Sequence, residues 1–196
     1  MVARIIVSDN VSLDGVMQDP AGDEGFERGG WVGLIKDRPD LGRVTLDEIM
    51  GCEAMLMGRR TYEWFAGRWP SRTGPLADRL NSFPKYVVSS TLRDPAWTNT
   101  TVLTGDLVEA VTGLKDRIDG DVVVSASARI VRTLLEHDLV DEMRLRVFPV
   151  VLGDGERLFR PTDRPHRMRL ARIETLDGDT AALTYQRIHT TQETTR

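Results

Sequence analysis

Three short polar segments of the chain carry groups that suit an anionic ligand. Gly58-Arg59-Arg60-Thr61 combines a glycine, which lets a phosphate approach the backbone, with two guanidiniums and a hydroxyl. Ser89-Ser90-Thr91 offers three hydroxyl donors in a row, and Ser125-Ala126-Ser127-Ala128 has side chains small enough for close backbone approach. Each segment alone is also typical of a solvated helix start or an N-cap. A binding site is therefore indicated only if the three segments converge.

The pattern around these segments predicts such a convergence. Apolar runs typical of buried strands precede them at Ala54–Met57, Lys85–Ser89 and Val122–Val124. Helical patterns follow the first and third segments, at Arg59–Ala66 and from Ser127 onward. In open α/β sheets ligands bind beyond the carboxyl ends of the strands, where helix N-termini present free N–H groups. The sequence thus predicts a crevice that suits a dinucleotide.

The remaining elements predict an α/β fold with a mostly parallel sheet and antiparallel strands at its C-terminal end. Ser12 to Gly42 is rich in Gly, Asp and Pro, and so long a connection suggests a lid. We expect one domain over residues 1–190, followed by a polar tail at 191–196. The further expected strands are Val2–Ser8, Glu142–Val151, Arg167–Thr175 and Thr180–Ile188, and a turn at Asp177-Gly178 joins the last two. Three further helices are expected: one that carries Leu46, Ile49 and Met50, one over Leu76–Phe83, and one that runs from an N-cap at Asp106 to Ile118.

Composition excludes several classes of protein. Of the 196 residues, 40% are hydrophobic and 29% charged, as in a globular domain, and 26 Lys and Arg against 30 Asp and Glu disfavour nucleic-acid binding. The short apolar runs indicate neither a membrane span nor a signal peptide, so we expect a cytoplasmic protein. Cys52 is the only cysteine, and the three histidines lack metal-ligand spacing, so no metal site is expected.

Motifs along nearly the whole chain resemble the dihydrofolate reductase-like family that includes the C-terminal reductase domain of the bacterial riboflavin-pathway deaminase-reductase. The chain is most similar to the stand-alone actinobacterial members called dihydrofolate reductase family proteins. The resemblance implies a three-layer fold with a twisted central sheet and helices on both faces, and it implies a homodimer. The motifs are, in order, VSLDGV, FERGGWV, LMGRRTYEWFAGRWP, PKYVVSSTL, VLTGDLVEAVTGLK, IVRTLLEHDLVDEMRLRVFPVVLGDGERLF and ALTYQR.

The resemblance also implies NADPH as the cofactor. In the family, the turn matched by Gly58, Arg59, Arg60 and Thr61 lies under the cofactor's phosphates. The hydroxyl run matched by Ser89, Ser90 and Thr91 lies near the adenosine 2′-phosphate. Ser125, Ala126, Ser127 and Ala128 fall at the pyrophosphate turn. The arginine pair gives a physical reason for NADPH over NADH, because an additional dianionic phosphate favours cations nearby.

On the substrate side, the family's Ser-Leu-Asp-Gly loop matches Ser12 to Gly15. Asp14 is a candidate catalytic carboxylate or an Asx-turn former beside Gly15. Asp47, on the flank of a helical stripe from which Glu48 points away, is a second candidate, and a solvated helix charge is the alternative. Trp31 and Tyr62 could stack on a planar substrate or could be core aromatics.

The chain also departs from the family pattern. Ser8-Asp9-Asn10-Val11 stands where the riboflavin-pathway domain carries a lysine, so reduction of the riboflavin intermediate is not expected. Ala126 replaces a glycine. The sequence predicts an NADPH-dependent oxidoreductase that transfers a hydride to a small heterocyclic C=N or C=O substrate. The alternatives are a non-catalytic dimeric nucleotide- or metabolite-binding protein that kept the fold, and a reductase that uses a flavin or deazaflavin.

Overall fold

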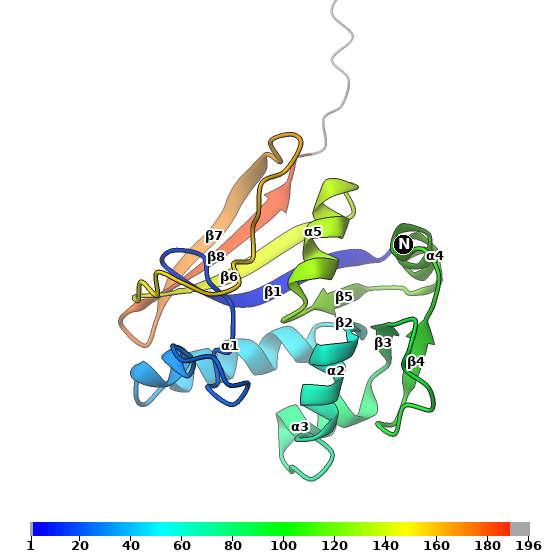
Figure 1. The fold of residues 1–196 in the computed structure, drawn as a ribbon, viewed down its shortest axis with the longest axis horizontal. Helices are drawn as coiled ribbons and strands as arrows, with labels where there is room; N and C mark the ends of the chain where they lie inside the picture. Colours follow the sequence, from blue (N-terminus) through cyan, green and yellow to red (C-terminus); the bar gives the residue numbers. More distant parts are fainter. Residues whose placement is uncertain (1, 189–196) are drawn as a thin grey trace, which may run out of the picture.

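The computed structural model describes residues 2–188, so the predicted tail at 191–196 lies outside the described residues. An eight-stranded sheet in the order β4-β3-β2-β5-β1-β6-β8-β7 forms the centre of the molecule (Figure 1). The strands are β1 (Arg4–Ser12), β2 (Ala54–Gly58), β3 (Lys85–Val88), β4 (Thr100–Leu103), β5 (Asp121–Val124), β6 (Glu142–Phe148), β7 (Met168–Leu176) and β8 (Thr180–Arg187). The helices are the short 3-10 helix η1 (Trp31–Leu34) and α1 (Pro39–Met50), α2 (Arg59–Ala66), α3 (Pro75–Ser82), α4 (Leu107–Arg117) and α5 (Ala128–Glu136).

The pairing of the strands confirms the predicted sheet. From β4 to β6 every neighbouring pair is parallel, and β8 is antiparallel to both β6 and β7. The hairpin between β7 and β8 turns at Asp177-Gly178, and Gly178 has a φ of 86°, a left-handed conformation that glycine adopts without a steric penalty. Within residues 2–188, no helix has the length and apolar character needed to cross a membrane.

Apolar side chains form one cluster on each face of the sheet, which gives the three predicted layers. On one face α4 and α5 bury Leu114 and Leu134 against the β-branched side chains of β1 and β5, such as Val7 and Val124. On the other face α1, α2 and α3 cover Met55 and the rest of the second cluster. Both faces of the central strands are buried, as expected for parallel strands with continuous apolar runs.

Three strands differ from the sequence prediction, and one of them is β6, which ends at Phe148 rather than at Val151. β1 runs on to Ser12 rather than ending at Ser8, because Asp9 to Ser12 pair with β6. β4 was not predicted; it is a short edge strand whose side chains are exposed or half-buried, so it lacks an apolar run. Met50 is also misplaced by the prediction: it is exposed, and Ile49 is the buried residue of α1.

The segment predicted to be a lid is anchored to the rest of the molecule. The buried Asp19 carboxylate accepts hydrogen bonds from the backbone N–H groups of Gly22, Asp23, Glu24 and Phe26. Asp23 pairs with Arg68 near the end of α2 at 2.7 Å. In the structure this loop therefore lies fixed beside α2.

Candidate functional site

The turns that follow β2 and β5 are in direct contact. Ser127 Oγ accepts a hydrogen bond from the Gly58 N–H at 3.0 Å and donates to Thr61 Oγ1 at 3.1 Å. Thr61 Oγ1 donates in turn to the Ala126 carbonyl at 2.8 Å. Ser127 and Thr61 are both buried. Two segments that are far apart in the sequence are thus joined into one corner at the carboxyl ends of adjacent strands.

Arg59 connects the turn after β3 to this corner. Its Nη1 donates to Thr91 Oγ1 at 2.7 Å, and its Nε donates to Glu63 at 2.6 Å. Ser89 Oγ accepts the N–H groups of Thr91 and Leu92, which bends the chain after β3 and leaves Ser90 exposed. The structure therefore brings together the three segments that the sequence analysis singled out, and we call this region the three-turn corner.

Both helices that start at the three-turn corner lack a side-chain cap. Gly58 and Ser127 occupy the N-cap positions of α2 and α5, and neither makes a side-chain hydrogen bond to the first turn. By contrast, Asp106 caps α4 by accepting the Glu109 N–H at 2.9 Å. Uncapped first-turn N–H groups and the positive end of the helix dipole favour an anion. The corner thus has the donors that a phosphate requires.

Ala126 has the backbone conformation of a glycine. Its φ is 51°, in the left-handed region, and no peptide bond between the described residues is cis. The Ala126 N–H donates to Asp9 Oδ1 at 2.6 Å, while its carbonyl accepts from Thr61. Side chains from β1 and α2 therefore hold both sides of this residue, which offsets the cost of a left-handed alanine.

Asp9 is a polar residue of the corner that sequence reasoning missed. It is 4% exposed, its Oδ2 is buried without a hydrogen-bond partner, and burial raises its pKa to about 7. The available signal was the polar run Ser8-Asp9-Asn10 directly after an apolar strand. That run was interpreted as the end of the strand, whereas it continues inside the sheet.

The predicted catalytic candidate Asp14 holds two loops together. Its carboxylate accepts hydrogen bonds from Ser12 Oγ at 2.7 Å, from Leu152 N at 3.0 Å and from Gly153 N at 2.9 Å. The Ser12 hydroxyl, followed by these N–H groups, holds the pKa of Asp14 well below its usual range. A carboxylate that stays ionised is a poor proton donor, so the geometry favours a structural role for Asp14.

Asp47 is a solvated helix charge, which is the alternative to a catalytic role that the sequence analysis left open. Its side chain is 68% exposed and lies 3.5 Å from Arg43 on the outer face of α1. Glu48, expected to point away, instead faces the sheet, where its Oε2 accepts from Ser8 Oγ at 2.6 Å and from Arg146 Nη1 at 2.9 Å. The 3.6-residue period predicted which positions of α1 share a face. It did not predict on which side of that face the helix packs against the sheet.

The two aromatic candidates for substrate stacking lie in the core. Trp31 is 1% exposed and packs edge-on against Phe148 at 5.4 Å between ring centroids. Tyr62 is 4% exposed, and its hydroxyl accepts the Trp97 N–H at 3.1 Å. Neither ring presents a free face to a ligand, so the structure corrects the prediction that they stack on substrate: both are packing residues.

Three acidic side chains of the anchored loop already have hydrogen-bond or ion-pair partners. Asp19, Asp23 and Glu24 have oxygens within 4.8 Å of one another. Asp19 is saturated by backbone N–H groups, Asp23 binds Arg68 and the Trp64 indole, and Glu24 pairs with Arg60 at 3.2 Å. Their oxygens thus organise the loop around α2 rather than forming an open ligand set.

Known proteins resemble this chain along nearly its whole length. Residues 3–182 match the model of the RibD C-terminal domain. Among curated proteins, the uncharacterized protein YyaP of Bacillus subtilis (strain 168) is 27% identical over 188 residues, which cover 93% of this chain and 94% of YyaP.

Solved structures share the fold. A putative riboflavin biosynthesis protein from Shewanella sp. PV-4 superposes with a TM-score of 0.76 at 23% identity, covering 96% of this chain and 100% of that one. The Thermotoga maritima deaminase/reductase, diaminohydroxyphosphoribosylaminopyrimidine deaminase/5-amino-6-(5-phosphoribosylamino)uracil reductase, gives 0.65 at 15% identity, with 95% of this chain but 57% of that one covered. Dihydrofolate reductase from Enterococcus faecalis complexed with NADP(H) gives 0.59 at 14% identity, covering 96% and 100%. These similarities confirm the dihydrofolate reductase-like fold.

Proposed function

Since the chain belongs to the RibD C-terminal domain family, we propose that it is an NADPH-dependent oxidoreductase that reduces a small heterocyclic substrate at a C=N or C=O bond. The observation that carries the proposal is the three-turn corner, in which Ser127 bonds to Gly58 at 3.0 Å and Arg59 bonds to Thr91 at 2.7 Å. Two of the structural relatives support the proposal: the Thermotoga maritima protein is named as a deaminase/reductase, and the Enterococcus faecalis dihydrofolate reductase was solved in complex with NADP(H).

The donors of the corner fit the charge of NADPH. The pyrophosphate would lie against the uncapped N-termini of α2 and α5, beside Gly58 and the segment from Ser125 to Ala128. Arg59 and Arg60 have side chains that are 49% and 79% exposed, so both guanidiniums can turn toward a phosphate. Ser90 and Thr91, which are exposed beside Arg59, complete a donor set for the 2′-phosphate.

Bound NADPH would supply the hydride, so the protein needs to orient and desolvate rather than to provide a nucleophile. The buried hydrogen bonds of Thr61, Ser127 and Asp9 fix the corner before the cofactor arrives. A pre-formed corner lowers the ordering cost of binding. Asp14 and Asp47 are not part of the proposal as proton donors, because Asp14 is held ionised and Asp47 faces outward.

A thermal-shift and fluorescence titration tests the cofactor. NADPH should raise the melting temperature and bind at least about tenfold more tightly than NADH, the difference expected from one charge-assisted phosphate contact. Arg59→Ala with Arg60→Ala should abolish most of that preference, whereas Arg43→Ala, an exposed arginine of α1, should leave it intact. No shift with saturating NADPH, or a shift with a flavin or deazaflavin alone, would overturn the cofactor assignment.

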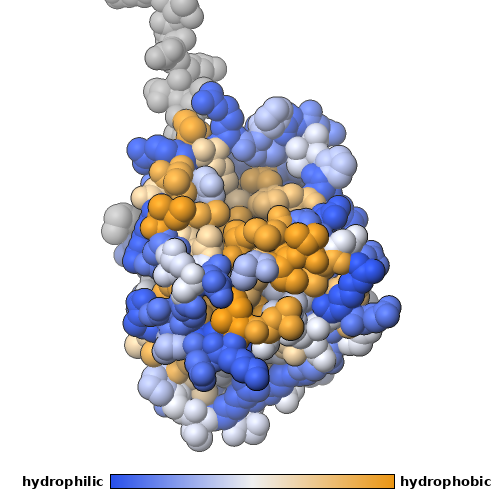
Figure 2. Space-filling view, turned by 90° about the vertical axis from the view of Figure 1, so that its left-hand side faces the viewer, coloured by the Kyte–Doolittle hydropathy of each residue, from blue (hydrophilic) through white to orange (hydrophobic). Residues whose placement is uncertain are grey.

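We also propose that the protein is a homodimer built from one reductase-like domain. β7 is an edge strand, and its Leu170 and Ile173 are 47% and 64% exposed. Figure 2, which views the side where β7 lies, shows an apolar patch bordered by hydrophilic residues. Exposed apolar patches of this kind mark association surfaces. Light scattering should give twice the chain mass, and Ile173→Lys should shift it to the monomer; a monomeric parent protein would contradict this.

A further inference from the structure

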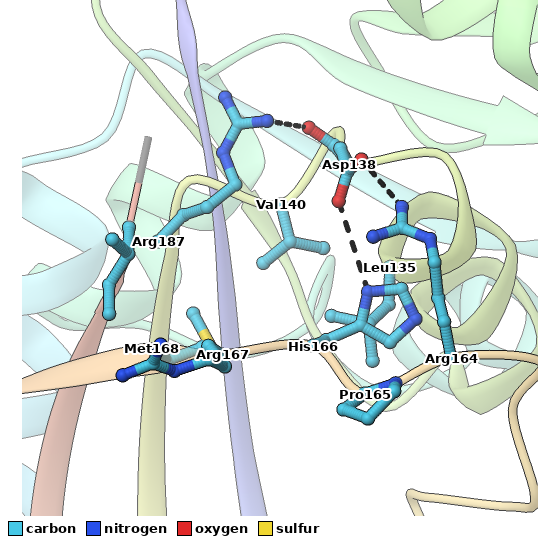
Figure 3. Close-up of a pocket in the computed structure, with 10 residues that line it drawn as sticks. Leu135, Asp138, Val140, Arg164, Pro165, His166, Arg167, Met168 and Arg187 are labelled. Atoms are coloured by element: carbon cyan, nitrogen blue, oxygen red, sulfur yellow. Dashed lines mark hydrogen bonds and ion pairs between the residues drawn. The ribbon is translucent and has the colours of Figure 1, made fainter. Parts of the chain in front are cut away.

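A cavity of about 510 Å³ lies at the end of the sheet opposite the three-turn corner. Its lining comes from the C-terminal end of α5, the chain that enters β6, the start of β7 and the end of β8 (Figure 3). The corner, by contrast, lies at the carboxyl ends of the parallel strands and at the N-terminus of α5. The two places are therefore separate, and this inference does not rest on the proposed function.

The lining carries more positive than negative charge. Among residues 2–188, Arg164, Arg167 and Arg187 line the cavity, and Asp138 supplies the one carboxylate of that lining. Asp138 pairs with Arg164 at 2.6 Å, and Asp141 behind it lies 3.3 Å from Arg187. Arg167 makes no hydrogen bond or ion pair within residues 2–188. The cavity thus has room for a further anion beside its guanidiniums.

Two buried nitrogen atoms of the same lining have no partner within residues 2–188. Arg187 Nε is buried and unbonded, although its terminal nitrogens bind Asp138 O and Asp141. His166 Nε2 is also buried and unbonded in a side chain that is 10% exposed, and its Nδ1 stands 3.8 Å from Asp138 Oδ1. A guanidinium Nε is a donor in every accessible ionisation state. Buried donors are nearly always satisfied, so the hydrogen bonding of Arg187 is incomplete at this end of the lining.

An apolar cavity of about 440 Å³ adjoins the charged one. The two share Leu135, His166 and Met168. The apolar cavity extends between α5 and the sheet, over Met143 of β6 and Tyr185 of β8, and Leu158 and Phe159 close it. The adjoining cavities, which we call the groove, therefore have Arg164, Arg167 and Arg187 at one end, and mainly aliphatic and aromatic side chains, together with Arg132 and Arg160, at the other.

We propose that this groove binds a small amphipathic organic anion, with its carboxylate at Arg167, Arg187 and His166 and its apolar body along Met143 and Tyr185. A planar guanidinium pairs with a carboxylate through two parallel hydrogen bonds. Apolar walls with a few convergent polar groups are typical of small-molecule sites. The carboxylate would give Arg167 a partner and lie beside the Arg187 guanidinium, while the apolar body would cover the side chains beside α5.

Isothermal titration calorimetry of the full chain with decanoate, decanol and decylamine tests the proposal. Decanoate should bind with one site per chain, and the uncharged and cationic analogues at least about tenfold more weakly, because only the carboxylate pairs with the arginines. Acetate, which lacks the apolar body, should also bind at least about tenfold more weakly. Equal affinity for decanoate and decanol, or no saturable binding, overturns the proposal.

Matched arginine variants locate the site. Arg167→Glu should weaken decanoate binding at least about tenfold, without loss of fold, since Arg167 is exposed and makes no hydrogen bond or ion pair among residues 2–188 that the change would break. Arg169 lies two residues further along the chain, in β7; within residues 2–188 its side chain bonds to Gln186, and it is outside the lining, so Arg169→Glu should change the affinity less than about twofold. Equal effects of both variants would contradict the site. Light scattering of Arg167→Glu provides the other outcome: if it converts a dimer to a monomer, a second copy of the chain occupies the groove and the proposal is wrong.

Discussion

The two ends of α5 treat their polar groups in opposite ways. At its N-terminal end, Ser127 and Thr61 are buried, and each hydroxyl is bonded to another element. At its C-terminal end, Arg187 and His166 keep buried nitrogens without partners in the described part of the chain. The comparison teaches that residues of a sequence motif, such as Thr61 and Ser127, can be the ones that hold the corner together. At the other end of α5 the polar groups are less completely paired.

The largest expected effect at the corner is that of Asp9→Asn. The pKa of Asp9 is about 7, above its usual value of 3.8, so the folded state holds a proton that the unfolded state releases between about pH 4 and pH 7. The stability that this group contributes is complete below pH 4 and is lost as the pH rises to 7. The amide that replaces the carboxyl group stays neutral and still accepts the Ala126 N–H. The variant should therefore be more stable than the parent at pH 8, by up to about 4 kcal/mol at 1.36 kcal/mol per pKa unit.

Urea denaturation at pH 4.5 and pH 8 measures this difference. Asp106→Asn is the matched control, because asparagine also caps a helix and Asp106 is exposed. Its stability should follow the parent protein at both pH values. If the free energy of unfolding of Asp9→Asn also differed from that of the parent protein by the same amount at both pH values, the titration of Asp9 would not be coupled to folding.

Thr61→Val should destabilise the corner by about 1–3 kcal/mol, since it removes, at nearly constant volume, the buried hydrogen bonds that the Thr61 hydroxyl makes to the Ala126 carbonyl and the Ser127 hydroxyl. Denaturant unfolding measures the loss. Thr112→Val on α4 is the control: its hydroxyl is exposed and bonds only within its own helix, to the Val108 carbonyl, so the loss there should be smaller. Equal losses of stability in the two variants would mean that the buried Thr61 hydroxyl contributes no more to stability than the exposed Thr112 hydroxyl.

Ala126→Gly should stabilise the protein by about 0.5–1 kcal/mol, because glycine adopts a φ of 51° without the steric cost that alanine meets. Ala128→Gly, within α5, should instead cost about 1 kcal/mol, since glycine disfavours the helix. The two melting temperatures should move in opposite directions. A loss in both would show that Ala126 is unstrained.

The smallest effect should come from His166→Phe at the other end of α5. The ring makes no hydrogen bond within residues 2–188 that the change would remove, and a buried nitrogen without a partner disappears, so stability should stay equal or rise by up to about 1 kcal/mol. Denaturant unfolding checks the sign against Thr61→Val. A loss of the size expected for Thr61→Val would mean that His166 is satisfied, and the contrast between the two ends would fail.

Elements with a strong local signal were predicted well. β2 and β5 are continuous apolar runs, and Asp106 is the N-cap of α4, as expected. β4 escaped prediction because an edge strand with polar threonines has no periodic apolar face. Trp31 and Tyr62 were interpreted as substrate contacts from their ring type, although large aromatic side chains are more often packed in a core.

The sequence by itself determined the order of the strands other than β4, the helices that flank them, the three polar turns and the family, because these depend on local pattern and on chain order. The tertiary structure decided which polar groups meet. Asp9 and Ala126 are 117 positions apart, and only the parallel pairing of β1 with β5 brings them within 2.6 Å. Hydrogen bonds and ion pairs depend on distance in space, so the bonded corner and Arg167, which has no ion pair within residues 2–188, could be distinguished only in the folded chain.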